Sequence, residues 1–144
     1  MCNYYSKNND VGNGIILCDD IKNNKIKEEY QKRSEVSLTK LNNYISFFSD
    51  KNLAILVLDI NGAEGIAIEN GFQLILRYHI PYIYLNFNPD LLREYGTDPE
   101  LLLQKLINNG YKIYINDFLN KDSYSIKKVM ENNSSNLILY LVYQ

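Results

Sequence analysis

The chain has 144 residues, which fits a single domain, and its 46% hydrophobic residues can supply a core. Its formal net charge is −2 and its Lys and Arg residues are scattered, which argues against nucleic acid as a partner. The modest basic cluster from Lys22 to Arg33 is diluted by Glu28 and Glu29, so we interpret it as a solvated loop or hairpin.

Cysteine usage and hydropathy predict where the protein resides. Cys2 and Cys18 are the only cysteines and His79 is the only histidine, so we expect neither a metal site nor a disulfide framework. No secretory signal is visible, and the longest apolar run, Leu53 to Leu58, is too short to span a bilayer. With a reducing compartment as the default, the sequence predicts a soluble cytoplasmic protein without membrane contact.

The first third of the chain carries weak structural signals. Residues 1–14 are mostly polar, with Gly12 and Gly14 as turn formers. Four short elements follow: extended segments at Ile15–Cys18 and Glu35–Leu38, a polar turn at Asp19–Lys25, and a helix at Leu41–Phe48. We therefore expect a polar N-terminal segment with a short hairpin over residues 1–32.

The strongest signal is the apolar run from Leu53 to Ile60, which does not alternate between polar and apolar residues. A strand that is apolar on both faces is typical of the interior of a parallel sheet with helices on each side. Asn61 and Gly62 end the run, and Ala63 opens a helix that extends to about Tyr78.

The remainder of the chain alternates between strand and helix signals. Strands are predicted at Tyr82–Phe87, Tyr111–Ile115 and Leu137–Tyr143, and helices after Asn88, after Asp98 and at Ser123–Met130. Asn88-Pro89 and Asp98-Pro99 each place a capping side chain before a proline, which is a strong helix start. The order from Leu53 onward is β-α-β-α-β-α-β, so the sequence predicts the α/β class.

Polar side chains follow two of these strands at their carboxyl ends, where open α/β sheets bind ligands. Asp59, Asn61 and Glu64 follow the first strand, and Asn86 and Asn88 end the second. If the two strands are neighbours, these groups lie within about 5–10 Å of each other and form a polar pocket. The alternative is that they only cap the helices that follow, where the helix dipole alone favours an acid.

Three segments carry a resemblance to a known family. Val36–Tyr44 is similar to a segment that ends in a Leu-Asp-Asp-Tyr type sequence, Leu56–Glu64 to a Lys-Ile-Asp-Val-Glu-Gly-Ala-Glu block, and Ile80–Pro89 to a Pro-x-Ile-x-x-Glu strand. Gly96-Thr-Asp, the leucines from Leu101 and Asn109-Gly-Tyr also match. From Arg33 onward the chain therefore resembles the C-terminal half of FkbM-type S-adenosylmethionine-dependent methyltransferases.

The resemblance implies a fold and an activity. Residues 33–144 would form the C-terminal half of a Rossmann-like class I methyltransferase sheet, with Leu53–Ile60 as its fourth strand and an antiparallel last strand. The implied reaction is methyl transfer from S-adenosylmethionine to a hydroxyl oxygen, which an acidic group would help to position or deprotonate. By this resemblance Asp59, Glu64 and Asn86 are candidate catalytic residues, and Asp59 and Asn61 candidate cofactor-binding residues.

The sequence departs from the family pattern in two ways. The glycine-rich loop and the ribose-binding acid lie on earlier strands of the family fold, and neither is found here. Asn42, Asn61 and Asn86 stand where the family carries acids, and an amide cannot act as a carboxylate base.

The departures leave a second interpretation open, that of a non-catalytic remnant or an α/β protein-interaction module. The fourth strand pairs with the first in the complete fold. Without that neighbour, the edge of Leu53–Ile60 is expected to pair with another strand or to form a dimer.

Overall fold

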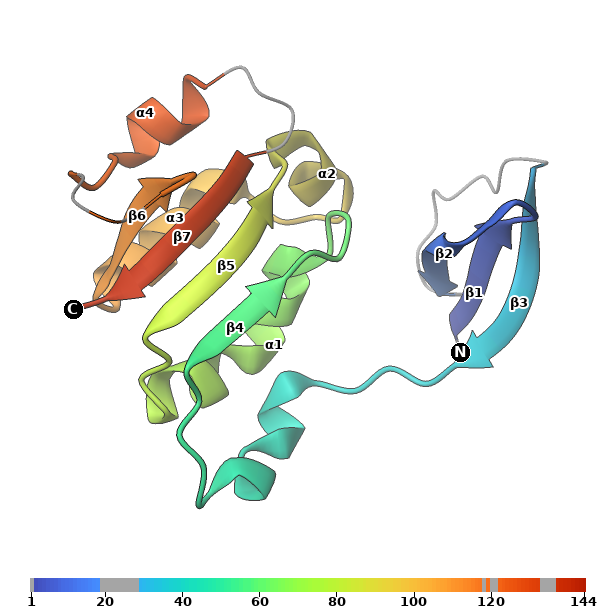
Figure 1. The fold of residues 1–144 in the computed structure, drawn as a ribbon, viewed down its shortest axis with the longest axis horizontal. Coiled ribbons are helices and arrows are strands. Elements are labelled where there is room, and N and C mark those ends of the chain that lie inside the picture. The colour runs from blue at the N-terminus through green and yellow to red at the C-terminus, as the bar shows by residue number, and fades with distance from the viewer. Residues whose placement is uncertain (1, 19–28, 118, 120–121, 133–136) are drawn as a thin grey trace. The chain divides into compact units, whose positions relative to one another are not determined.

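The computed structural model describes residues 2–18, 29–117, 119, 122–132 and 137–144, and the chain folds into two compact units (Figure 1). Unit 1 extends to Thr39 and unit 2 runs from Lys40 to Gln144. The predicted boundary before Arg33 falls within the last strand of unit 1. Among the described residues, no helix has the length and apolar character needed to cross a membrane.

Unit 1 is a three-stranded antiparallel sheet in the order β2-β1-β3. Its strands are β1 (Cys2–Lys7), β2 (Asp10–Cys18) and β3 (Tyr30–Val36). The predicted strand at Ile15–Cys18 is the end of β2, whereas the polar residues before it form strands and not the expected turns. The predicted turn at residues 19–25 lies outside the described residues.

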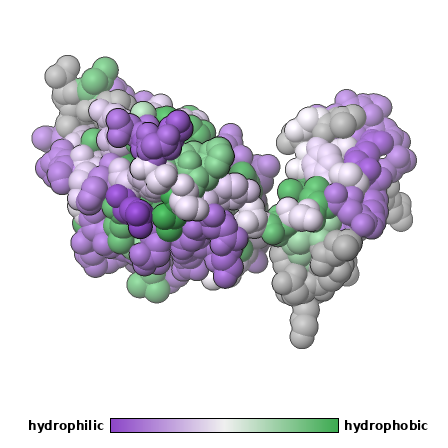
Figure 2. Space-filling view, turned by 90° about the horizontal axis from the view of Figure 1, so that it is seen from below, coloured by the Kyte–Doolittle hydropathy of each residue, from purple (hydrophilic) through white to green (hydrophobic). Residues whose placement is uncertain are grey.

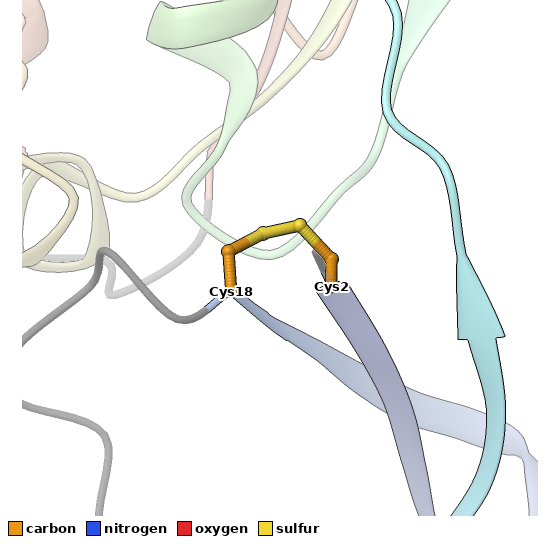
Figure 3. The surroundings of a disulfide bond; sticks show 2 residues. All are labelled: Cys2 and Cys18. Carbon is orange, nitrogen blue, oxygen red and sulfur yellow. A yellow bond between two sulfur atoms is a disulfide. The ribbon is translucent and has the colours of Figure 1, made fainter.

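Cys2 and Cys18 form a disulfide, so the expectation of no disulfide framework is wrong (Figure 3). The two residues are 16 positions apart in sequence, but the hairpin places them directly opposite each other with their Cα atoms 4.0 Å apart. Because disulfides persist mainly in oxidising compartments, the cysteines no longer support a reducing one, and the cytoplasmic location stays a prediction.

Unit 2 is a four-stranded mixed sheet with helices, which confirms the α/β class (Figure 1). Its helical elements are η1 (Leu41–Tyr44), η2 (Ser46–Phe48), α1 (Glu64–Arg77), α2 (Pro89–Glu94), α3 (Pro99–Asn108) and α4 (Ile126–Met130). Its strands are β4 (Ile55–Leu58), β5 (Tyr82–Phe87), β6 (Tyr111–Ile115) and β7 (Leu137–Tyr143). The strand order is β4-β5-β7-β6; β4 is parallel to β5, and β7 is antiparallel to both of its neighbours.

One face of this sheet carries the core. Its strand side chains include Leu58, Ile83, Leu85, Phe87, Leu139 and Leu141, and they share a cluster with buried residues of the helices, including Ile68, Ile75, Leu103 and Leu106. In Figure 1, α1 and α3 lie behind the strands, and no described helix lies in front of β4, β5 and β7. Within the described part of the chain, helices therefore cover only one face of the sheet along these three strands.

The prediction that Leu53–Ile60 is buried on both faces is wrong. The strand is shorter, is the edge strand of the sheet, and alternates between its two faces: Leu58 is buried, whereas Ile55 and Val57 are 54% and 59% exposed. A continuous apolar run predicts burial on both sides only when helices cover both sides.

Helix starts follow the predicted capping chemistry at α2 and α3. Asn88 Oδ1 accepts from the N–H groups of residues 90 and 91, and Asp98 Oδ1 accepts from those of residues 100 and 101. The helix expected at Leu41–Phe48 is two short 3₁₀ turns instead. The expected helix at Ser123–Met130 begins later, after its cap Ser125.

Candidate functional site

The chain reverses sharply between β4 and α1. Asn61 and Gly62 both have positive φ angles, 53° and 104°, a region that non-glycine residues rarely adopt. A Cβ atom on Gly62 would lie 3.0 Å from the Cβ and the carbonyl oxygen of Leu91, at the start of α2. Glycine is therefore required here both by the backbone angle and by the close approach of α2.

Glu64 closes this turn. Its side chain is only 1% exposed, and its two carboxylate oxygens accept the N–H groups of Ile60 and Gly62, each at 2.8 Å. A carboxylate in the first turn of α1 is also favoured by the helix dipole. Both oxygens of this predicted catalytic residue are thus engaged by the backbone of the turn, which gives Glu64 a structural role in shaping the site.

Asp59 and Asn86 meet at the carboxyl ends of β4 and β5. The Asn86 side-chain amide donates to Asp59 Oδ1 at 2.8 Å. The two strands are parallel neighbours with Leu58 opposite Leu85, so the residues that follow them in sequence emerge at the same edge. Asp59 is exposed and Asn86 is half-buried, which leaves the carboxylate accessible to a ligand.

The other two predicted polar residues have different environments. Asn61 is exposed on the left-handed turn next to Asp59. Asn88 caps α2 through its side-chain oxygen. The capping interpretation therefore holds for Asn88, whereas the Asp59–Asn86 bond is a contact between side chains that caps no helix.

Two surface pockets lie elsewhere in unit 2. One, of about 490 Å³, lies between α3 and α4 and is lined by Glu100, Leu101, Gln104, Ile126, Lys127, Met130 and Glu131. The other, of about 610 Å³, lies at the start of β4 and is lined by Ser49, Lys51, Asn52, Leu53, Ala54, Arg77, Tyr78 and Pro81. Neither pocket includes a predicted site residue.

Sequence reasoning missed the second pocket, because its two cationic side chains, Lys51 and Arg77, are separated in sequence and belong to no motif.

Within the described part of the chain, no group of three His, Cys, Asp or Glu side chains is placed to hold a metal ion. Hydrophobic and hydrophilic residues are interspersed on the face of the molecule that Figure 2 shows.

Comparison with protein-family models, with curated proteins and with solved structures found no match for the chain.

Proposed function

We propose that unit 2 is the C-terminal half of an FkbM-type, S-adenosylmethionine-dependent methyltransferase domain, and that Asp59 and Asn86 contact its ligand. The observation that carries the proposal is the 2.8 Å bond between these two side chains. It lies at the carboxyl ends of parallel neighbours, where open α/β sheets bind ligands.

The strand arrangement supports the same proposal. The family resemblance implies a last strand that runs antiparallel, and the polar pocket predicted from the residues requires that the strands before Asp59 and Asn88 be neighbours. β4 and β5 pair in parallel, and β7 is antiparallel to both of its neighbours. The turn of the family's most specific block falls between β4 and α1, which is also where the ligand would approach.

Each polar residue has a role that follows from its environment. The exposed carboxylate of Asp59 can accept hydrogen bonds from ligand hydroxyl groups, and the Asn86 amide holds that carboxylate in place. The exposed Asn61 adds an amide that can either donate or accept. Glu64 acts through the turn backbone, because both of its oxygens are already occupied.

The residues present fit the cofactor only in part. A carboxylate and an amide suit the hydroxyl groups of a ribose or of an acceptor. The two pockets described above, however, are not lined by these groups, and the glycine-rich loop of the family is not found in this sequence. The proposal therefore assigns Asp59 and Asn86 to ligand positioning and derives no chemical step from them.

Isothermal titration of the full chain with S-adenosylmethionine tests this function. We expect measurable binding that Asp59→Ala weakens by at least about tenfold, because a charged hydrogen-bond acceptor is lost. Glu94→Ala removes an exposed acid of α2 and serves as the matched control, with unchanged affinity expected. Absence of binding at saturating cofactor, or equal binding by the Asp59→Ala variant, would reject the proposal.

A second candidate function is a non-catalytic α/β protein-interaction module. Two observations favour it: no described strand pairs with the outer edge of the apolar strand β4, and both carboxylate oxygens of Glu64, a catalytic candidate, are bound by the turn. This function predicts no cofactor binding but retained protein association. In the first candidate function, the acceptor of the methyl group would be a small molecule or a glycan.

A further inference from the structure

Four asparagines of the chain are each followed by a glycine, and these are Asn13, Asn61, Asn70 and Asn109. In such a pair the backbone nitrogen of the glycine can attack the carbonyl carbon of the asparagine side chain and expel its amide group. Glycine favours this attack because it has no Cβ atom to obstruct the approach and because its backbone is the most adaptable. The last three of these pairs belong to unit 2.

The side chain of Asn61 differs from those of the other two asparagines in unit 2. Asn70 donates its side-chain N–H to the carbonyl oxygen of Ile66 at 3.0 Å, and Asn109 donates to that of Lys105 at 2.7 Å. Within the described part of the chain, the exposed side chain of Asn61 has no hydrogen-bond partner. Its carbonyl carbon is therefore the one that can turn freely toward the backbone.

The turn between β4 and α1 itself selects this reactive pair. Asn61 has a φ angle of 53° and Gly62 one of 104°. Asparagine is one of the few residues besides glycine that adopt the left-handed region readily, and the second angle favours glycine. The geometry that reverses the chain thus places an Asn-Gly pair next to Asp59.

Glu64 holds the attacking atom of this pair. Gly62 is buried, and its N–H group donates to Glu64 Oε2 at 2.8 Å. A backbone nitrogen attacks only after it has lost its proton, and a carboxylate is far too weak a base to remove that proton. The negative charge of the carboxylate also disfavours an amide anion at this distance. Glu64 therefore keeps the nitrogen in its unreactive, protonated form.

The glycine nitrogens of the other two pairs are held by the backbone. Gly71 lies in the interior of α1, where N–H groups bond to carbonyl oxygens of the same helix. Gly110 donates its N–H to the carbonyl oxygen of Ile107 at 3.0 Å. Of the three pairs, only Asn61-Gly62 is thus held by a side chain, which a single substitution can alter.

We propose that Asn61 is a site of spontaneous deamidation, and that the Glu64 carboxylate restrains this reaction in the folded chain. In the reaction, a bond forms between the Gly62 nitrogen and Asn61 Cγ, and the bond between Cγ and Nδ2 breaks. The Nδ2 group leaves as ammonia, with the balance of one proton coming from Gly62. Water then adds to either carbonyl carbon of the resulting succinimide and opens the ring, which leaves aspartate or isoaspartate at this position.

The product would alter the candidate site. Either form of the product adds a carboxylate next to Asp59, where the chain now carries an amide. Isoaspartate also adds a methylene group to the backbone of the turn that Glu64 closes. The inference goes beyond the proposed function and does not depend on it, because the reaction and its restraint both follow from the turn alone.

The test is the rate of deamidation at each asparagine, measured by trypsin digestion and mass spectrometry after incubation of the full chain at mildly alkaline pH. Cleavage after Lys51 and Arg77 releases residues 52–77 as one peptide, so Asn61 and Asn70 are compared in the same fragment. In guanidinium chloride the two should react at similar rates. In the folded wild type Asn61 should react at least about tenfold more slowly, as expected for loss of a charged hydrogen bond before attack.

Glu64→Gln tests the restraint directly, because it keeps the shape of the side chain but removes its charge and one acceptor oxygen. We expect Asn61 to react at least about tenfold faster in the folded variant, with the rate at Asn70 unchanged. Glu94→Gln makes the same substitution at an exposed acid of α2 and should change neither rate. Amide exchange at Gly62 should accelerate in Glu64→Gln, and cooperative melting establishes that both variants fold.

Three outcomes would overturn the proposal. Asn61 could react as fast in the folded wild type as in guanidinium chloride, its rate could be the same in Glu64→Gln, or Asn61 and Asn70 could accelerate together, which would indicate a general loosening of unit 2. The first comparison needs no variant, so it decides even if Glu64→Gln does not fold. None of these measurements involves S-adenosylmethionine, so their failure is distinguishable from failure of the proposed function.

Discussion

The side-chain amide of Asn86 holds the carboxylate of Asp59 at 2.8 Å across the carboxyl ends of two parallel strands. The residues are 27 positions apart in sequence, and only the pairing of β4 with β5 brings them together. Because this bond is exposed to solvent, a substitution can test its contribution to ligand binding separately from its contribution to stability.

Asn86→Ala is expected to change stability little. Hydrogen bonds that water can replace contribute about 0.5–1.5 kcal/mol, and this one is solvent-accessible, so we expect a loss of less than about 1 kcal/mol. Urea unfolding of the variant and of the wild type measures the difference. A larger loss would mean that the pair is part of the folding core and would weaken its assignment to ligand binding.

Glu64 should contribute far more to stability than the Asp59–Asn86 pair. Replacing it with Ala leaves the N–H groups of Ile60 and Gly62 without their acceptor, the one of Gly62 in a buried position, at a cost of about 2–4 kcal/mol. Glu69→Ala on the exposed side of the same helix is the matched control, with a change expected within about 0.5 kcal/mol. Equal urea midpoints for the two variants would contradict the role assigned to Glu64.

The elements of unit 2 that could be predicted from sequence are those whose ends are marked by local sequence signals. The bounds of β5, β6 and β7 match their predicted ranges because each strand is an apolar run between helix-ending or turn-forming residues such as Gly110. The starts of α2 and α3 could be predicted because the capping signal is also local. An Asn or Asp before a proline accepts hydrogen bonds from the N–H groups of the first turn of the helix that it caps.

What could not be predicted depends on contacts that are distant in sequence. β3 reads as polar, with five of its seven residues exposed, so its place in a sheet depends on pairing with β1. The disulfide follows from that same sheet, because only the register of β1 with β2 brings Cys2 opposite Cys18. The role of Glu64 depends on the left-handed turn before it, which its sequence position alone does not reveal.

Reduction of the disulfide should unfold unit 1 and leave unit 2 folded. Unit 1 has three strands and ends at Thr39, and domains below about 40 residues usually need a cross-link to be stable. A disulfide that closes a loop of this length contributes about 3 kcal/mol. The paired Cys2→Ser and Cys18→Ser variant, followed by amide exchange, should show loss of protection in β1–β3 only.

Unit 2 supplies the internal control for that experiment, because its described residues contain no cysteine. Protection of the β5 and β7 amides should therefore be the same in the variant and in the wild type. If unit 1 keeps its protection after reduction, its strands are stable without the cross-link.

Tyr111 should make the stability of unit 2 depend on alkaline pH. Burial, and secondarily the nearby Tyr143, raise the pKa of the Tyr111 phenol from 10 to about 12. Its hydroxyl donates to the carbonyl oxygen of Ile80 at 2.7 Å, a bond that the phenolate cannot form. Because the folded state holds the proton more tightly than the unfolded state, this stabilisation is complete below pH 10 and is lost as the pH rises to about 12.

The measurement for Tyr111 is the free energy of unfolding of the wild type and of Tyr111→Phe on both sides of this range. Phe keeps the ring that packs against Tyr143 but cannot titrate, so the variant should be less stable than the wild type at neutral pH. The gap should narrow, by on the order of 2 kcal/mol, as the pH rises through the range, because only the wild type loses the tyrosine contribution. A gap that stays constant between neutral pH and pH 12 would show that Tyr111 titrates equally in the folded and the unfolded states.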